Sequence, residues 1–418
     1  MMNRQTILRL TLLATTSLLL TGKARCVEWP DFRGPTAQGH AAEGVKLPTQ
    51  WSQTKNVAWK QALPGEGWSS PVLWKGKLYL TAAVPQGSGY SLQTLSLNEA
   101  DGRILWSKEI FKQPSNSPRI HKKNSHASPT PVITPDEKLY IHFGHQGTAC
   151  LDLSGKVLWK NNSIKYPPVH GNGGTPLVVG DILFFSCDGA RNPFVIALDR
   201  NTGKTVWKKE RNTGAKKKFS FNTPLLIKVN GKEQIISLGS NAVIAYEPKT
   251  GNEIWRCRYD GYSVIPRPVY GHGLIFLSSG YDRPTFYAIK PTGKGDVTDT
   301  HIAWTLSKGA PHTPSPLLVG DELYIVSDGG IAQCLDAKTG KAHWRERVCG
   351  SISSSPFYAD GKIYIHDESG KGIVLQADKT FKKLTENDMK ERTLASCAIG
   401  DNAFYLRTAE GLYKISEK

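Results

Sequence analysis

A unit of 40 to 60 residues recurs along most of the chain and is the strongest constraint on its fold. Each copy opens with a Ser/Thr-Pro pair, continues as a short apolar strand, turns at Gly or Asp, and returns as a second strand. Ser70-Pro71 opens the first copy. Later copies open at Thr130-Pro131, Thr175-Pro176, Thr223-Pro224, Arg267-Pro268, Ser315-Pro316 and Ser355-Pro356, and Ser396-Cys397 opens an eighth without the proline.

The second half of each unit is an apolar strand, a Thr-Gly type of turn and a tryptophan. The pattern Leu-Asp-x-x-Thr-Gly-Lys-x-x-Trp is complete at 198–207 and 335–344. The tryptophans of the repeat are Trp59, Trp106, Trp159, Trp207, Trp255, Trp304 and Trp344, spaced 40 to 53 residues apart. A large side chain at one place in every unit predicts a contact between neighbouring units, so we expect these indoles to pack between sheets.

Units of this length that contain four short strands are typical of β-propeller blades. Paired-helix repeats have similar lengths, but the apolar residues here alternate with period two and stop at Gly, Pro and Asn-Gly turns. Eight openings predict an all-β, eight-bladed propeller with four antiparallel strands per blade. The orphan strand around Trp59 should complete the last blade and close the ring with the C-terminal strand. Seven blades are the alternative, if the eighth unit packs irregularly.

The N-terminus has the features of a secretory signal over residues 1–24: Arg4 and Arg9, then an uncharged stretch of eleven residues. That stretch is shorter than the ~20 residues needed to span a bilayer. Arg25 directly precedes Cys26, where a lipid anchor requires a small residue, so we do not expect lipidation. We therefore expect an exported protein of the periplasm or cell envelope, with an irregular segment at 25–56, a propeller at 57–418, and no transmembrane segment in the mature chain.

Charge and cysteine spacing limit the partners. The net charge is +17, and loss of residues 1–24 removes three basic residues and no acid, which leaves +14. A basic exported protein favours polyanions of the envelope, and we expect no nucleic acid partner. The seven cysteines include no close pair, so we expect no structural zinc or other metal site. We expect a monomer.

The tryptophan motif at 198–207 and 335–344 resembles the quinoprotein-type propeller repeat. Pyrroloquinoline-quinone (PQQ) alcohol dehydrogenases share this repeat with the outer-membrane protein assembly factor B (BamB) family. The resemblance covers about residues 57–418, and the segment 29–35 is also similar to the N-terminal segment of PQQ-like repeat proteins. It implies the propeller fold, whereas activity differs among proteins that have this fold.

The dehydrogenases of this resemblance hold PQQ with calcium or a lanthanide, and two adjacent cysteines stack on the quinone. No cysteines are adjacent here, and no motif supplies the metal ligands. We therefore expect no cofactor, and disfavour PQQ with calcium. The favoured function is a non-catalytic scaffold that binds a protein segment or an envelope polymer, with outer-membrane assembly as the setting that the resemblance implies. The alternatives are a PQQ- or metal-dependent oxidoreductase, and a protein that binds or degrades polysaccharide.

The loops that enter the first strand of each blade should gather on one face near the axis. Their polar and aromatic residues predict a ligand-binding funnel formed by Trp68, His126, His170, Asn172, Asn222, Arg267 and His312. Such a ring suits an anion, a sugar or a metal ion. The alternative is that these are loop residues whose hydrogen bonds are satisfied by their neighbours or by water.

Overall fold

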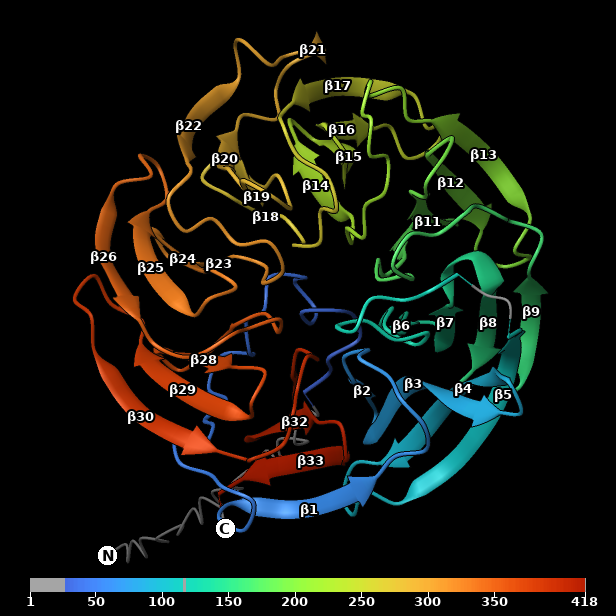
Figure 1. Cartoon of the computed structure of the whole chain (residues 1–418), viewed down its shortest axis with the longest axis vertical. Coiled ribbons are helices and arrows are strands. Elements are labelled where there is room, and N and C mark those ends of the chain that lie inside the picture. The colour runs from blue at the N-terminus through green and yellow to red at the C-terminus, as the bar shows by residue number, and fades with distance from the viewer. Residues whose placement is uncertain (1–26, 116–117, 418) are drawn as a thin grey trace, which may run out of the picture.

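The strands of the protein form a closed ring of eight sheets (Figure 1). The computed structural model describes residues 27–115 and 118–417. Each sheet has four antiparallel strands, the first at the axis and the fourth at the rim, and one sheet has a short fifth strand that pairs parallel to its outer strand. The prediction of eight four-stranded blades is confirmed, and the alternative of seven is not what the chain adopts. The signal sequence at 1–24 and Cys26 lie outside the described residues.

The blades follow chain order. Blade 1 contains β2 (Val72–Trp74), β3 (Lys77–Gln86), β4 (Gly89–Asn98) and β5 (Ile104–Gln113), and blade 2 contains β6 (Val132–Ile133), β7 (Lys138–His142), β8 (Thr148–Asp152) and β9 (Val157–Asn161). Blade 3 contains β10 (Leu177–Val179), β11 (Ile182–Cys187), β12 (Phe194–Asp199) and β13 (Thr205–Glu210), and blade 4 contains β14 (Leu225–Val229), β15 (Lys232–Gly239), β16 (Ala242–Tyr246) and β17 (Glu253–Arg258). Blade 5 contains β18 (Val269–Gly271), β19 (Leu274–Ser278), β20 (Phe286–Ile289) and β22 (Ile302–Leu306). Blade 6 contains β23 (Leu317–Val319), β24 (Glu322–Val326), β25 (Ile331–Asp336) and β26 (Ala342–Arg347). Blade 7 contains β27 (Phe357–Ala359), β28 (Lys362–His366), β29 (Lys371–Gln376) and β30 (Lys383–Asp388).

Blade 8 joins the two ends of the chain. It contains β31 (Ala398–Ile399), β32 (Ala403–Arg407) and β33 (Gly411–Ser416), and its outer strand is β1 (Val57–Ala62). β1 pairs antiparallel with β33, with Lys60 opposite Tyr413. The first regular strand, β1, thus covers the edge that β33 would otherwise leave open. This confirms the prediction that the strand around Trp59 completes the last blade.

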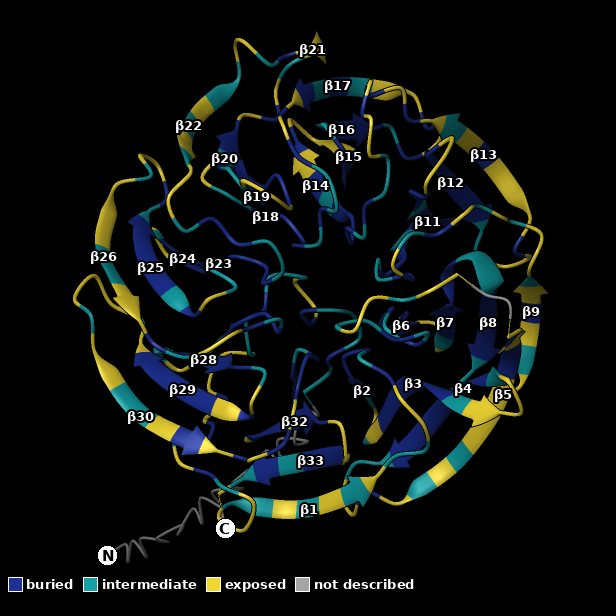
Figure 2. Cartoon of the chain, in the orientation of Figure 1, coloured by how far each residue is buried: buried dark blue, intermediate teal, exposed yellow. Residues whose placement is uncertain are grey.

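Burial falls from the inner strands to the rim (Figure 2). All five residues of β32 are buried, whereas β1 alternates between half-buried and exposed residues. Six of the seven hydrophobic clusters described lie between two neighbouring sheets, and the seventh spans blades 7, 8 and 1 together with the N-terminal segment. Phe184 of blade 3, for example, belongs to one cluster with Ile235 and Tyr246 of blade 4. The core of a propeller is therefore divided into interfaces between blades.

Five of the repeat tryptophans lie on a glycine in the last turn of the next blade. The pairs are Trp59 on Gly102, Trp106 on Gly155, Trp159 on Gly203, Trp207 on Gly251 and Trp304 on Gly340. A Cβ atom at any of these glycines would lie 2.5 to 3.0 Å from the indole, and each has a positive φ. Glycine is required there both for the turn and for the approach of the ring.

The indole N–H groups add a hydrogen bond to the same turns. The bonds run from Trp59 to Glu99 O (3.1 Å), from Trp159 to Arg200 O (2.9 Å), from Trp207 to Pro248 O (2.9 Å), from Trp304 to Ala337 O (3.0 Å) and from Trp344 to Asp378 O (3.0 Å). Each carbonyl belongs to the following blade. At the interfaces of Trp59, Trp159, Trp207 and Trp304, one side chain therefore supplies both apolar contact and a polar anchor.

Blade 4 departs from this pattern. Its Trp255 is fully buried and donates to Gln234 Oε1 of its own blade at 2.9 Å. A fifth strand, β21 (Gly295–Asp296), pairs parallel to β17, with Gly295 opposite Trp255. This strand comes from the long insertion that precedes Trp304 and lies at the rim of blade 4 (Figure 1).

Blade 7 has no tryptophan in its outer strand, and another part of the chain supplies an indole there. Trp51 packs on Gly372 of β29 and on Phe404 of β32, so it lies between blades 7 and 8. Its backbone N–H donates to Asn387 Oδ1 at 2.8 Å. The ring is therefore completed from the N-terminal segment.

Residues 27–56 run as an irregular strap across the centre of the ring (Figure 1). Arg33 is buried and donates to the carbonyls of Pro316 and Pro356, which belong to blades 6 and 7. Asp31 forms a 3.0 Å ion pair with Arg267 of blade 5. Burial raises the pKa of Asp31, and Arg267 opposes that shift. The strap thus joins several blades at the axis.

Helical structure is minimal in the described part of the chain. It is confined to η1 (Gly144–Gln146), a single 3-10 turn. Within residues 27–115 and 118–417, no helix has the length and apolar character needed to cross a membrane.

Replacement of Trp207 by Ala tests the indole contact. Trp207 is 8% exposed and lies on the turn that contains Gly251. Removal of a buried large side chain should lower the free energy of unfolding by about 3–5 kcal/mol. Urea unfolding followed by fluorescence measures this loss, and a loss below about 1 kcal/mol would contradict the packing role.

Gly251→Ala tests the glycine half of the contact, with Gly231→Ala as its control. Both residues have positive φ, but a Cβ at Gly251 would meet the Trp207 ring at 2.5 Å, whereas one at Gly231 meets nothing within 4 Å. Backbone strain should cost about 1–2 kcal/mol in both variants. The clash should add about 1–3 kcal/mol at Gly251 alone. Equal losses in urea unfolding would show that the indole does not need this glycine.

Candidate functional site

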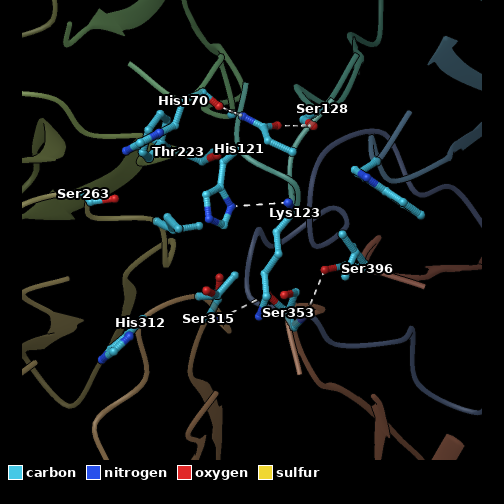
Figure 3. Close-up of a pocket in the computed structure, with 18 of the residues that line it drawn as sticks. His121, Lys123, Ser128, His170, Thr223, Ser263, His312, Ser315, Ser353 and Ser396 are labelled. Carbon is cyan, nitrogen blue, oxygen red and sulfur yellow. Dashed lines mark hydrogen bonds between the residues drawn. The ribbon is translucent and has the colours of Figure 1, made fainter. Parts of the chain in front are cut away.

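A cavity of about 900 Å³ opens on the axis, on the side where chains enter the first strand of each blade (Figure 3). We call it the funnel. Its lining residues are Phe32, Trp68, Ser70, His121, Lys123, Asn124, Ser128, Thr130, His170, Gly173, Thr175, Lys217, Phe219, Phe221, Thr223, Tyr262, Ser263, Ile265, Tyr281, His312, Thr313, Ser315, Asp328, Ser353, Ser355, Leu394 and Ser396. Phe32 belongs to the strap, so the N-terminal segment contributes to the wall.

The Ser/Thr residues that open the repeats form a hydrogen-bonded belt around the funnel. The backbone N–H of one blade donates to the hydroxyl of the next blade at the same repeat position. The bonds are Ser70 to Thr130 (3.0 Å), Thr130 to Thr175 (3.0 Å), Thr175 to Thr223 (3.0 Å), Arg267 to Ser315 (3.0 Å), Ser315 to Ser355 (3.0 Å) and Ser355 to Ser396 (2.9 Å). These bonds join the blades at the inner rim, as the indoles do at the outer rim.

Two buried arginines lie where the belt is interrupted. Arg267 replaces the hydroxyl of blade 5, and its side chain donates to Pro224 O (3.1 Å), Phe32 O (2.6 Å) and Asp31 (3.0 Å). Between blades 8 and 1, Arg407 donates to Ser69 O, to Ser69 Oγ and to Thr81 O, at 3.1, 2.7 and 2.9 Å. Each guanidinium therefore links two blades at a gap in the belt.

An arc of six rings follows one side of the funnel. The sequence is His121, His170, Phe219, Tyr262, Tyr281 and His312, with neighbouring centroids 5.4 to 5.9 Å apart. The interplanar angles are 69° to 82°, so each ring meets the next edge to face. We call this set the aromatic arc.

Lysines and one carboxylate set the electrostatics of the funnel. Lys123 extends across the opening toward Ser353 (Figure 3) and pairs with Glu368 at 2.6 Å. Lys217 lies at the arc, donates to Tyr262 Oη at 2.6 Å, and is 4.0 Å from the centre of that ring. This hydrogen bond to Tyr262 raises the pKa of Lys217. Lys217 therefore remains charged at neutral pH.

The histidine at the start of the arc is uncharged at neutral pH. Burial lowers the pKa of His121, and nearby His170, Lys122 and Lys123 lower it further. Asp328, the carboxylate of the lining, accepts the backbone N–H of His312 at 2.6 Å and of Thr313 at 3.3 Å. Its position is therefore fixed by the entry loop of the same blade.

Three of the seven residues predicted for the funnel line it: Trp68, His170 and His312. They come from blades 1, 3 and 6. Arg392 lies over the Trp68 ring, 5.6 Å from its centre. His170 and His312 lie in the aromatic arc.

The other four lie outside the lining, because each is held by neighbours. His126 stacks on Tyr90, with ring centres 4.8 Å apart. Asn172 accepts from Tyr166 Oη (2.8 Å), and Asn222 donates to Pro266 O (2.6 Å). Both amides are buried, and Arg267 is 1% exposed and holds the strap.

The sequence prediction missed most of the funnel. The belt hydroxyls are visible in the sequence as Ser/Thr-Pro openings, but that pattern does not show that they line a cavity. Phe219, Tyr262 and Tyr281 lie in loops that vary in length between blades, so no repeat position marks them. Lys123 and Lys217 belong to short basic runs, which are typical of solvent-exposed loops.

No group of three or more His, Cys, Asp and Glu residues suited to a metal ion occurs in the described part of the chain. The six cysteines described there are free, and five of them are buried. Burial raises the pKa of each of these thiols, which makes them poor nucleophiles. The funnel chemistry that remains is hydrogen-bond donation, aromatic contact and positive charge.

Known proteins share this architecture. Residues 41–190, 191–314 and 293–415 match the sequence model of a family described as outer membrane protein assembly factor BamB. BamB of Burkholderia pseudomallei is 30% identical over 117 residues, which are 28% of this chain and 30% of that protein. The quinoprotein ethanol dehydrogenase of Pseudomonas aeruginosa is 24% identical over 304 residues, 67% of this chain and 44% of that protein. The chain thus spans less than half the length of either relative.

A solved structure supports the fold independently. BamB from Moraxella catarrhalis superposes with a TM-score of 0.61 at 14% identity, over 87% of this chain and 97% of that one.

Thr175→Val tests the belt, with Thr175→Ser as its control. Valine keeps the shape of the threonine side chain but leaves the backbone N–H of Thr130 without its acceptor. The site is buried, since Thr175 is 2% exposed. An unsatisfied buried donor costs about 1–3 kcal/mol. Serine retains the oxygen, so its loss should be smaller. Urea unfolding compares the two, and equal losses would argue against the hydroxyl.

Proposed function

Because the chain belongs to the outer membrane protein assembly factor BamB family, we propose that it is an exported, monomeric, non-catalytic scaffold of outer-membrane assembly. The funnel holds a segment of a partner protein. The observation that carries this proposal is the funnel itself: a cavity of about 900 Å³ with a wall of hydrogen-bond donors, aromatic rings and lysines. Cavities of this size that combine apolar walls with a few fixed polar groups are typical binding sites.

Rigidity supports a binding role. The belt joins Ser70 to Thr130, Thr175 and Thr223 through backbone N–H groups, so the hydroxyls cannot move independently of the blades. Arg267 ties the strap to the same ring. A pre-organised site loses little freedom when it binds, which favours affinity.

The second candidate is a quinone-dependent oxidoreductase, which the similarity to the Pseudomonas ethanol dehydrogenase favours. The residues of the funnel do not fit a calcium–quinone site. The lining contains one carboxylate, Asp328, and its Oδ2 already accepts two backbone N–H groups. Calcium takes six to eight oxygen ligands, several of them carboxylates. No two cysteines are adjacent in the sequence.

Affinity capture tests the scaffold. The tagged protein, incubated with an envelope extract of the producing organism, should retain components of outer-membrane protein assembly, identified by mass spectrometry. Because the chain is strongly basic, a basic protein of matched charge serves as control for adhesion to polyanions. Capture of the same set by both proteins, or of no assembly component, would refute the proposal.

Reconstitution with PQQ and calcium tests the oxidoreductase. We expect no dye reduction with primary alcohols and no quinone absorbance retained after gel filtration. Alcohol-dependent dye reduction that requires PQQ would replace the scaffold with an enzyme. A glycan array addresses the polysaccharide alternative in the same way: selective retention of one glycan would favour it.

A further inference from the structure

We propose that the segment held in the funnel is a short acidic stretch of polypeptide with an apolar or aromatic side chain next to its carboxylates. This inference rests on the proposed function and names the chemistry of the partner. Three properties of the funnel carry it: its ring of hydroxyl groups, the lysines of its entry loops and the packing of the aromatic arc.

The belt presents O–H donors to the cavity. Each of the six acceptor hydroxyls receives one backbone N–H and keeps its own O–H, which is available to donate. Among the residues that the structure describes, no acceptor is assigned to the protons of Thr130, Thr175, Thr223, Ser315, Ser355 and Ser396. All six line the funnel. A ring of donors favours ligands rich in acceptor oxygens, which are carboxylates and backbone carbonyls.

Five lysines lie in two of the entry loops that contribute to the funnel. Lys123 and Lys217 line the cavity, and Lys122, Lys216 and Lys218 are their neighbours in the same loops. Lys123 pairs with Glu368, and Lys217 is 3.9 Å from Asp282. Within the described residues, Lys122, Lys216 and Lys218 form no ion pair. An acidic partner would satisfy these charges and would be steered toward the opening.

The aromatic arc distinguishes a peptide from a glycan. A pyranose stacks on an open ring face, but the rings of the arc meet one another at 69° to 82°, which directs edges against faces. The result is an irregular apolar wall at Phe219, Tyr262 and Tyr281. Such a wall accommodates an apolar or aromatic side chain, which it contacts at ring edges and faces alike. We therefore favour polypeptide over acidic polysaccharide.

Fluorescence anisotropy with a defined probe tests the inference. The probe is a fluorescein-labelled peptide of about ten residues with aspartates on both sides of one phenylalanine. One comparison peptide replaces the aspartates by lysine, and another replaces the phenylalanine by alanine. We expect the acidic aromatic peptide to bind at least about tenfold more tightly than either, which corresponds to about 1.4 kcal/mol. An oligogalacturonate competitor represents the glycan.

Matched variants locate the site. The combined variant Lys216→Gln, Lys217→Gln and Lys218→Gln should weaken binding at least about tenfold. Lys228→Gln, Lys232→Gln and Lys249→Gln remove the same charge from blade 4, on or beside turns at the far end of its strands from the funnel loop, and should leave the affinity unchanged. Phe219→Ala tests the arc, with the melting temperature as a check on folding. The exposed lysine set tests the proposal even if Phe219→Ala fails to fold.

The outcomes separate this inference from the scaffold role. Equal affinity for all three peptides, equal loss in the two lysine sets, or binding of the galacturonate in place of the peptide would overturn it. If assembly components are still captured in that case, the scaffold stands and binds through another surface. If the peptide binds in the funnel but no assembly component is captured, the acidic-segment inference stands and the assembly role falls.

Discussion

The structure depends on one constraint: each sheet must be joined to the next at both its inner and outer edges. At the rim, an indole lies on a glycine turn, as Trp207 lies on Gly251. At the axis, a backbone N–H meets a hydroxyl of the next blade, as Thr130 meets Thr175. Neither contact lies within a blade, so a single sheet would lose both. The fold is therefore a cooperative ring, and its closure through β1 and β33 removes the remaining open edge.

The inner contact also makes the funnel. A hydroxyl that accepts from the backbone has its oxygen fixed and its proton directed elsewhere, and for Thr130 and Thr175 the space available is the cavity on the axis. The requirement for ring closure thus produces a donor-lined opening. The donor-lined cavity arises here from a structural need, and the entry loops add charges and aromatic rings to its wall.

Sequence alone was sufficient for what repeats locally. Blade number, the closing strand and the tryptophan positions follow from a pattern in which Trp207 stands a fixed distance after Gly203. The funnel could be predicted only in part, because its members come from irregular loops. Their place in the entry loops put His170 and His312 correctly in the wall, but His126 and Asn222 lie in equivalent loops and contact Tyr90 and Pro266 instead. Such choices depend on neighbours distant in sequence.

Arg267 shows how a break in the repeat becomes a functional feature. Its backbone N–H still donates to Ser315, so the belt continues on one side, but its side chain has no hydroxyl to offer Thr223. The guanidinium instead reaches Pro224 O, which keeps blades 4 and 5 joined, and also holds Asp31 and Phe32 of the strap. Phe32 then forms part of the funnel wall. One substitution in the repeat therefore both repairs the ring and positions the N-terminal segment at the cavity on the axis.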